Sequence, residues 1–130
     1  MPMNETTLAP VVFDQLQQAM ACDPPGFTEL YRDYLADAGQ ALEALHDAVY
    51  RRQAGELRAR AHHLKGSSLV LGAREVALCA AALEESGQSG DLQGTSAMVD
   101  RTRQALREVE AELASRLGSA VIPAEKTGAV

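Results

Sequence analysis

The spacing of the apolar residues constrains this chain more than any other feature of its sequence. Between Phe27 and Val49 apolar side chains recur at steps of three and four without a break, and similar steps run from Leu92 to Leu117 over about seven helical turns. A half-buried strand would instead alternate apolar and polar residues. Aromatic residues make up only 4% of the chain, and alanine, leucine and glutamate are abundant. The sequence therefore predicts an all-α protein.

Residues that start and stop helices separate the expected elements. Asp23 followed by Pro24 is a good N-cap with proline in the first helical position, so a long helix is expected from there to about Tyr50. Gly72 lies where the third helix should end or kink, and Asp91 is expected to cap the fifth. The first helix is expected over residues 8–20, the third after residue 53, and the end of the fourth within residues 86–90.

Four long amphipathic helices with short connections favour an antiparallel up-down-up-down four-helix bundle, with the short N-terminal helix as an accessory that caps one end. A chain of 130 residues is long enough for one hydrophobic core, so residues 1–117 are expected to form a single domain. Beyond Leu117 the periodicity is lost. Residues 118–130 are therefore expected to form a flexible C-terminal tail.

Charge and composition exclude several classes of partner. The formal net charge of −6 argues against nucleic acid, because affinity for the phosphate backbone comes from an excess of lysine and arginine. The longest apolar run is far too short to cross a bilayer, so no membrane span is expected. Cys22 and Cys79 show no metal or redox spacing, which favours reduced thiols and a cytoplasmic location.

The charge is unevenly placed along the chain. Residues 51–74 carry six cations against one acid, which makes this window about +5 and leaves about −11 for the rest. A solvated helix face explains such a window, and so does local steering of an acidic partner. Both interpretations stay open at this point.

The most informative stretch within this window surrounds His62. With Leu57, Ala61, Leu64, Ser68 and Leu71 as the buried stripe of the third helix, His62 and Lys65 lie on the flank at roughly 140° and 80° from Leu57. Glycine inside a helix costs about 0.8–1 kcal/mol relative to alanine, yet Gly66 stands one turn after His62.

This arrangement suits phosphoryl acceptance. A neutral imidazole supplies an attacking lone pair without a separate base, the missing side chain at Gly66 clears the approach, and Lys65 can compensate the phosphoryl charge. His63 lacks this context because its neighbour one turn on is Ser67, and His46 lies on another helix as an ordinary surface residue.

The segment Ala61-His62-x-Leu64-Lys65-Gly66-Ser67-Ser68-x-x-Leu71-Gly72-Ala73 resembles the signature of histidine-containing phosphotransfer (HPt) domains, the carriers of multistep phosphorelays. The resemblance implies a four-helix bundle with an accessory helix and a phosphoryl acceptor at His62. It implies a carrier that accepts the group from a receiver-domain aspartate of a hybrid histidine kinase and passes it to an aspartate of a response regulator. No cofactor or metal is expected on this chain, because Mg²⁺ belongs to the receiver.

Candidate residues for receiver docking are chosen by their position on the helix face that carries His62. Leu69, seven residues after His62 on the same face, is a candidate apolar contact, and Arg58 and Ser67 are further candidates for receiver docking. Ser67 and Ser68 also suit close helix packing. A monomer is expected.

Three other functions compete with phosphotransfer. A non-catalytic helical adaptor that binds a signalling partner through the same bundle face explains the fold and the acidity, but it does not explain an interior glycine beside an exposed histidine. A metal-binding bundle lacks its usual Glu-x-x-His pairs, and adjacent histidines on a helix point about 100° apart. A stand-alone kinase lacks a glycine-rich nucleotide loop and room for an ATP-binding domain, so any activity is that of a phosphoryl carrier without a nucleotide site.

Overall fold

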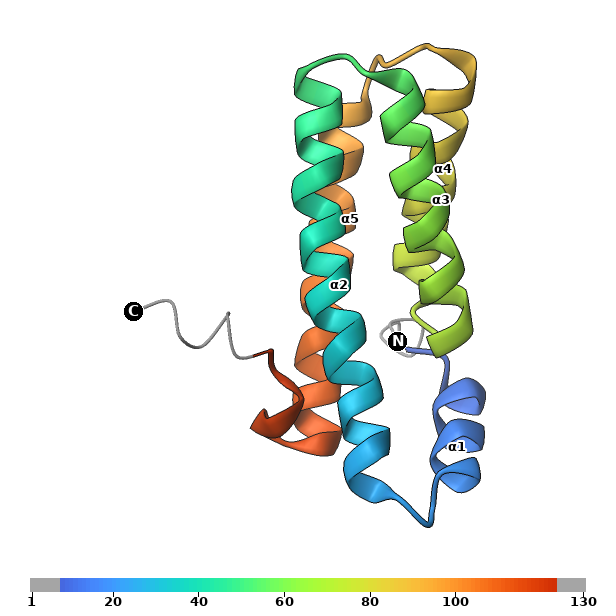
Figure 1. The fold of residues 1–130 in the computed structure, drawn as a ribbon, viewed down its shortest axis with the longest axis vertical. Coiled ribbons are helices and arrows are strands. Elements are labelled where there is room, and N and C mark those ends of the chain that lie inside the picture. The colour runs from blue at the N-terminus through green and yellow to red at the C-terminus, as the bar shows by residue number, and fades with distance from the viewer. Residues whose placement is uncertain (1–7, 124–130) are drawn as a thin grey trace, which may run out of the picture.

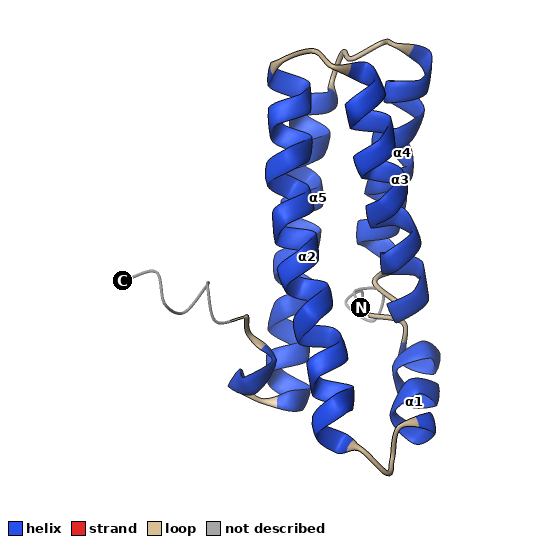
Figure 2. Cartoon of the chain, viewed as in Figure 1, coloured by secondary structure: helices blue, strands red, loops and turns tan. Residues whose placement is uncertain are grey.

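The structure is a computed structural model and describes residues 8–123. In this range the chain folds into helices joined by short loops. The elements are α1 (Pro10–Ala19), α2 (Pro24–Tyr50), α3 (Ala54–Leu71), α4 (Arg74–Ser89), α5 (Thr95–Leu117) and a short 3₁₀ helix, η2 (Ser119–Val121). Figure 2 shows no strand in this range. The all-α prediction is confirmed.

The four long helices lie alongside one another. Each of the pairs α2 and α3, α3 and α4, α4 and α5, and α2 and α5 is in contact. Figure 1 shows their connections at alternating ends of the molecule, with α1 beside the lower ends of α2 and α3. Within residues 8–123, no helix combines the length and the apolar character that crossing a bilayer requires.

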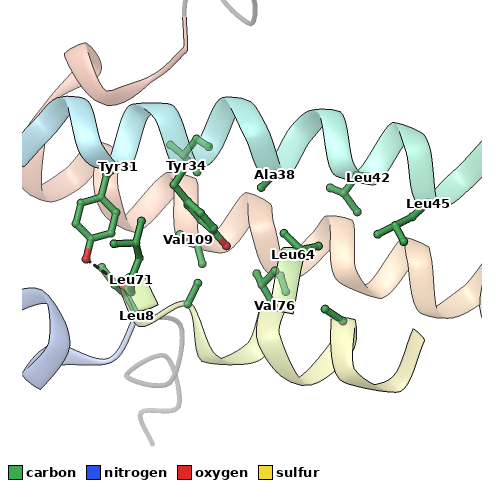
Figure 3. Packing of buried hydrophobic residues seen from close by; sticks show 14 of the residues in the cluster. Leu8, Tyr31, Tyr34, Ala38, Leu42, Leu45, Leu64, Leu71, Val76 and Val109 are labelled. Carbon is green, nitrogen blue, oxygen red and sulfur yellow. Dashed lines mark hydrogen bonds between the residues drawn. The ribbon is translucent and has the colours of Figure 1, made fainter. Parts of the chain in front are cut away.

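The core lies where the apolar stripes of these helices face one another. The stripe predicted for α3 is correct, since all five of its members are buried: Leu57, Ala61, Leu64, Ser68 and Leu71. Leucines and valines of the other long helices meet this stripe from α2, α4 and α5, as Figure 3 shows for part of the cluster. Burying this stripe fixes the rotation of α3, and the opposite side of the helix is thereby left to solvent.

Two tyrosine hydroxyls fasten α2 to the second half of α3. Tyr31 donates a hydrogen bond to the carbonyl oxygen of Leu71 at 2.9 Å (Figure 3), and the Tyr34 hydroxyl lies 2.7 Å from Oγ of Ser68. A buried hydroxyl without a partner would be costly. The buried serine on the apolar stripe of α3 is therefore satisfied within the core.

The predicted helix signals at Asp23 and Gly72 are correct. The Asp23 carboxylate accepts a hydrogen bond from the backbone N–H of Gly26 at 3.1 Å and caps α2. Gly72 ends α3 with φ at +84°, a left-handed conformation that glycine adopts without strain. A Cβ at Gly72 would lie 3.0 Å from Cβ of Val12. The glycine therefore also lets α1 pack closely against this turn.

The predicted cap of the fifth helix is wrong. Helix α5 begins only at Thr95, after Gly94 with φ at +80°, whereas Asp91 lies in the preceding loop. There its carboxylate accepts a hydrogen bond from the backbone N–H of Gln93 at 3.1 Å. Aspartate stabilises local turns in the same way that it caps helices, so the residue type alone does not distinguish the two positions.

The structure places packed residues beyond the predicted domain boundary at Leu117. After Gly118 the chain turns through η2 and returns to the bundle, where Val121 is fully buried in the core. The carbonyl oxygen of Ala120 accepts a hydrogen bond from the guanidinium of Arg32 on α2 at 3.1 Å. Residues 118–123 therefore pack against the domain, and the rest of the predicted tail, 124–130, lies outside the described residues.

Candidate functional site

His62 lies on the exposed side of α3, halfway along the helix. The side chain is 69% exposed, whereas its neighbours Ala61 and Leu64 are buried in the core. Lys65, three residues further, is half-buried beside it with 32% of its side chain exposed. The flank positions predicted for both residues are the ones that the structure shows.

An acidic residue that the sequence pattern did not indicate joins these two side chains. Glu84, on α4, places Oε2 2.8 Å from Nδ1 of His62 and Oε1 2.7 Å from Nζ of Lys65. The hydrogen bonds from Lys65 and then from His62 lower the pKa of the Glu84 carboxyl below its ordinary value. Glu84 is therefore an anion at neutral pH, shared between an ammonium group and an imidazole.

The charge of Glu84 decides which ring nitrogen of His62 carries the proton. An ionised carboxylate can only accept hydrogen bonds, so Nδ1 must be the donor in this contact. In a neutral imidazole the other nitrogen, Nε2, then has no proton and keeps its lone pair. The contact with α4 thus holds His62 in the tautomer whose nucleophilic atom is Nε2.

Two glycines shape this site in opposite ways. A Cβ at Gly66 would meet nothing within 4 Å, so the surface one turn after His62 is open. A Cβ at Gly87 would lie 2.7 Å from the carbonyl oxygen of Ala54 and 2.7 Å from the backbone nitrogen of Arg58. Gly87 is therefore the residue that lets α4 approach the first half of α3 closely, and Glu84 lies one turn before it.

The two predicted serines form hydrogen bonds away from His62, and the predicted docking residue Leu69 lies exposed on α3. Ser67 donates a hydrogen bond to the carbonyl oxygen of Leu64 in its own helix at 3.2 Å, and Ser68 is buried against α2. Within residues 8–123, neither hydroxyl forms a hydrogen bond with His62. Leu69 is 56% exposed on the outer side of α3 and is followed by the exposed Val70.

The basic window is partly neutralised by nearby acids. Arg51 pairs with Asp47 at 3.0 Å, and Arg60 pairs with Glu56 at 2.7 Å, each with the acid one turn earlier on the helix. Arg58, one turn before His62, is exposed and forms no ion pair within the described range. Of the predicted docking residues, it is therefore the one with an uncompensated charge.

His63 and His46 are both exposed, on α3 and α2 respectively. In the part of the chain that the structure covers, neither ring has a hydrogen-bond partner, in contrast with His62. Of the three histidines, His62 is therefore the one whose ring is held by a neighbouring side chain.

A cleft of about 370 Å³ lies away from this site, between α2 and α5. It is lined by residues such as Gly39, Leu42 and Leu106, with Pro123 from the end of the described chain, and by none of the predicted site residues. No three His, Cys, Asp or Glu side chains in residues 8–123 gather as ligands of a metal ion would. His62 therefore lies on an open helix surface and not in this cleft.

Comparisons with known proteins agree with this arrangement. The sequence model of the Hpt domain family matches residues 29–112, which include the whole of α3 and α4. Among solved structures, the crystal structure of histidine-containing phosphotransfer protein B (HptB) from Pseudomonas aeruginosa PAO1 is similar, with a TM-score of 0.80 and 28% sequence identity. The match covers 85% of this chain and 94% of that one. No curated protein sequence matches.

Proposed function

Because the chain belongs to the Hpt domain family, whose model spans most of the bundle, we propose that it is a histidine phosphotransfer protein of a multistep phosphorelay. His62 accepts a phosphoryl group from a receiver-domain aspartate of a hybrid histidine kinase. The group then passes to an aspartate of a response regulator. The protein itself has no nucleotide site in this proposal and acts as a carrier.

The observation that carries the proposal is the pairing of His62 with Glu84. A hydrogen bond of 2.8 Å to an anionic carboxylate holds the proton on Nδ1 and leaves the Nε2 lone pair free. The ring is 69% exposed, and the surface at Gly66 beside it is open. A nucleophile presented in this way suits an electrophile that arrives on a second protein.

The transfer step needs no proton movement on this chain. Nε2 of His62 attacks the phosphorus of the aspartyl phosphate in line with the bond that breaks. The P–N bond forms, the P–O bond breaks, and the receiver aspartate leaves as a carboxylate. Mg²⁺, held by the receiver, supplies charge neutralisation on the partner's side of the transfer, and Lys65 supplies it on this side.

Docking is proposed on the outer side of α3. Arg58 carries an uncompensated positive charge one turn before His62, and Leu69 and Val70 expose apolar surface beyond Gly66. Receiver domains present an acidic pocket around their aspartate, so a cation beside the nucleophile favours the encounter. The apolar pair then provides contact area that excludes water.

The finer fold and setting form part of the same proposal. An up-down-up-down bundle of α2 to α5, with α1 as the accessory helix, is supported by the alternating connections in Figure 1. A cytoplasmic location is supported by Cys22 and Cys79, which are both free thiols. We take the protein to act as a monomer.

The test is incubation with a phosphorylated receiver domain from the same cell. The expected result is transfer of one label to the protein, stable in alkali and labile in acid, as phosphohistidine is. Two-dimensional NMR of the imidazole ring should then place the phosphoryl group on Nε2. Absence of label on any residue, together with a stable complex with the receiver, would instead support the helical adaptor that binds through this face.

A further inference from the structure

The hydrogen bond between His62 and Glu84 has a second role once the phosphoryl group is in place. Phosphorylation uses Nε2, and Nδ1 keeps its position 2.8 Å from the carboxylate. Resting on the proposed function, we propose that Glu84 is a positioning residue for the outgoing transfer: it holds the proton on Nδ1 of phosphorylated His62 and so keeps the phosphoryl group transferable.

The chemistry depends on what the imidazole becomes when it leaves. In the outgoing step a receiver aspartate oxygen forms a bond to phosphorus, the P–N bond breaks, and its electron pair returns to Nε2. With a proton on Nδ1 the ring leaves as neutral imidazole. Without that proton it must leave as an imidazolate anion, a much poorer leaving group because neutral imidazole is a very weak acid. The protonated form of phosphohistidine is therefore the reactive one.

The surroundings of the ring show why the charge of Glu84 matters. Lys65 lies on the same helix, 2.7 Å from Oε1 of Glu84, and Arg58 stands one turn before His62. Both are cations, which disfavour a proton on the ring. From α4, Glu84 is the charged side chain that contacts the ring, and within residues 8–123 it is the sole hydrogen-bond partner of the His62 imidazole. Removing its charge would take away the carboxylate that faces Nδ1 and leave the two cations on this side of the ring unopposed.

The size of the effect follows from the short distance. An opposite charge within hydrogen-bond reach moves a pKa by about 1–3 units. Glu84→Gln keeps the shape of the side chain and an oxygen that can accept the Nδ1–H bond, but it removes the charge. We expect the pH at which phosphorylated His62 loses reactivity to fall by about one unit, and transfer to slow about tenfold at pH values above both midpoints.

The experiment compares wild type, Glu84→Gln and the matched control Glu85→Gln, whose carboxylate is exposed on the same helix. Each protein is phosphorylated with phosphoramidate, and the rate of transfer to an unphosphorylated receiver domain is measured from pH 5.5 to 9. The expected result is a profile shifted to lower pH for Glu84→Gln and an unchanged profile for the control. A Glu84→Gln profile that coincides with that of wild type overturns the proposal.

A measurement on the wild type alone guards against a variant that folds poorly. The NMR titration of Nδ1 in phosphorylated His62 is compared between the folded protein and the same protein in urea. Retention of the proton to a higher pH in the folded state supports the proposal, and equal midpoints refute it. Failure of the wild type to take up any phosphoryl group refutes the proposed function itself, which distinguishes the two results.

Discussion

Replacing Gly66 by glutamine should separate stability from function at this site. Gly66 is exposed within α3, and a Cβ there meets nothing within 4 Å, so a side chain fits without displacing any neighbour. Glycine in a helix interior is less favourable than glutamine by about 0.5–1 kcal/mol. For a domain of this size that gain corresponds to a Tm about 2–5 °C higher.

Function should change in the opposite direction. The new side chain stands one turn from His62, on the surface proposed above for receiver docking. A displacement of the reacting atoms by about 1 Å can cost about 100-fold in rate, so transfer to His62 should fall by about that factor. The assays are thermal unfolding followed by circular dichroism and a phosphotransfer time course with a phosphorylated receiver domain.

Gly39 provides the matched control. It also lies inside a helix, and a Cβ at this position would meet nothing within 4 Å, but it belongs to α2, where it lines the cleft between α2 and α5. Gly39→Gln should raise Tm similarly and leave the transfer rate unchanged. A Gly66→Gln protein that is destabilised, or one that transfers at the wild-type rate, would refute the argument that this glycine provides access to His62.

Four further predictions follow from particular contacts. His62→Gln should abolish phosphoryl acceptance with the helix content unchanged, whereas His63→Ala should still take up acid-labile label. Lys65→Ala removes a charge partner and no core contact, so it should slow transfer without unfolding the protein. In the wild type, the rate of association with a receiver, measured by stopped flow, should fall as salt is added, because exposed charges are screened beyond about 8 Å at physiological ionic strength. Gly87→Ala brings a methyl group to 2.7 Å from backbone atoms of α3 and should lower the free energy of unfolding in urea by about 1–3 kcal/mol. Burial raises the pKa of Tyr34 to about 12 in the folded protein, whereas an unfolded tyrosine ionises at about pH 10. Ionisation therefore favours the unfolded state, and the free energy of unfolding should fall between about pH 10 and 12. Tyr34→Phe should make this fall smaller, as measured by urea midpoints across that pH range.

The part of the site that could be predicted from the sequence is the part that lies on one helix. His62, Lys65 and Gly66 are three and four residues apart, and helix geometry alone determines that such residues share a face. Glu84 could not be predicted, because its contact depends on how α4 is rotated and shifted along α3. That register is set where Gly87 meets the backbone of α3, a tertiary contact with no local signature.

The errors in the fold have the same physical origin. Asp91 satisfies a backbone N–H in either a turn or a helix cap, so its residue type does not locate the start of α5. Val121 lies in a run of three apolar residues, 120–122, after the last regular helix, and so short a run shows no helical period. Its burial depends on the space that α2 and α5 leave between them, which is decided only when the bundle is assembled.

The exposure of His62 on the outer side of one helix has a kinetic consequence for a carrier. One ring with one free nitrogen can serve a single partner at a time, so phosphate donor and phosphate acceptor exclude each other and exchange follows ping-pong kinetics. The phosphorylated carrier must leave the first partner before it meets the second. An acceptor in large excess would occupy carriers that are still unphosphorylated, block the donor and lower the flux. The ratio of the partners, and not only their affinities, would therefore set the signal that passes through this surface.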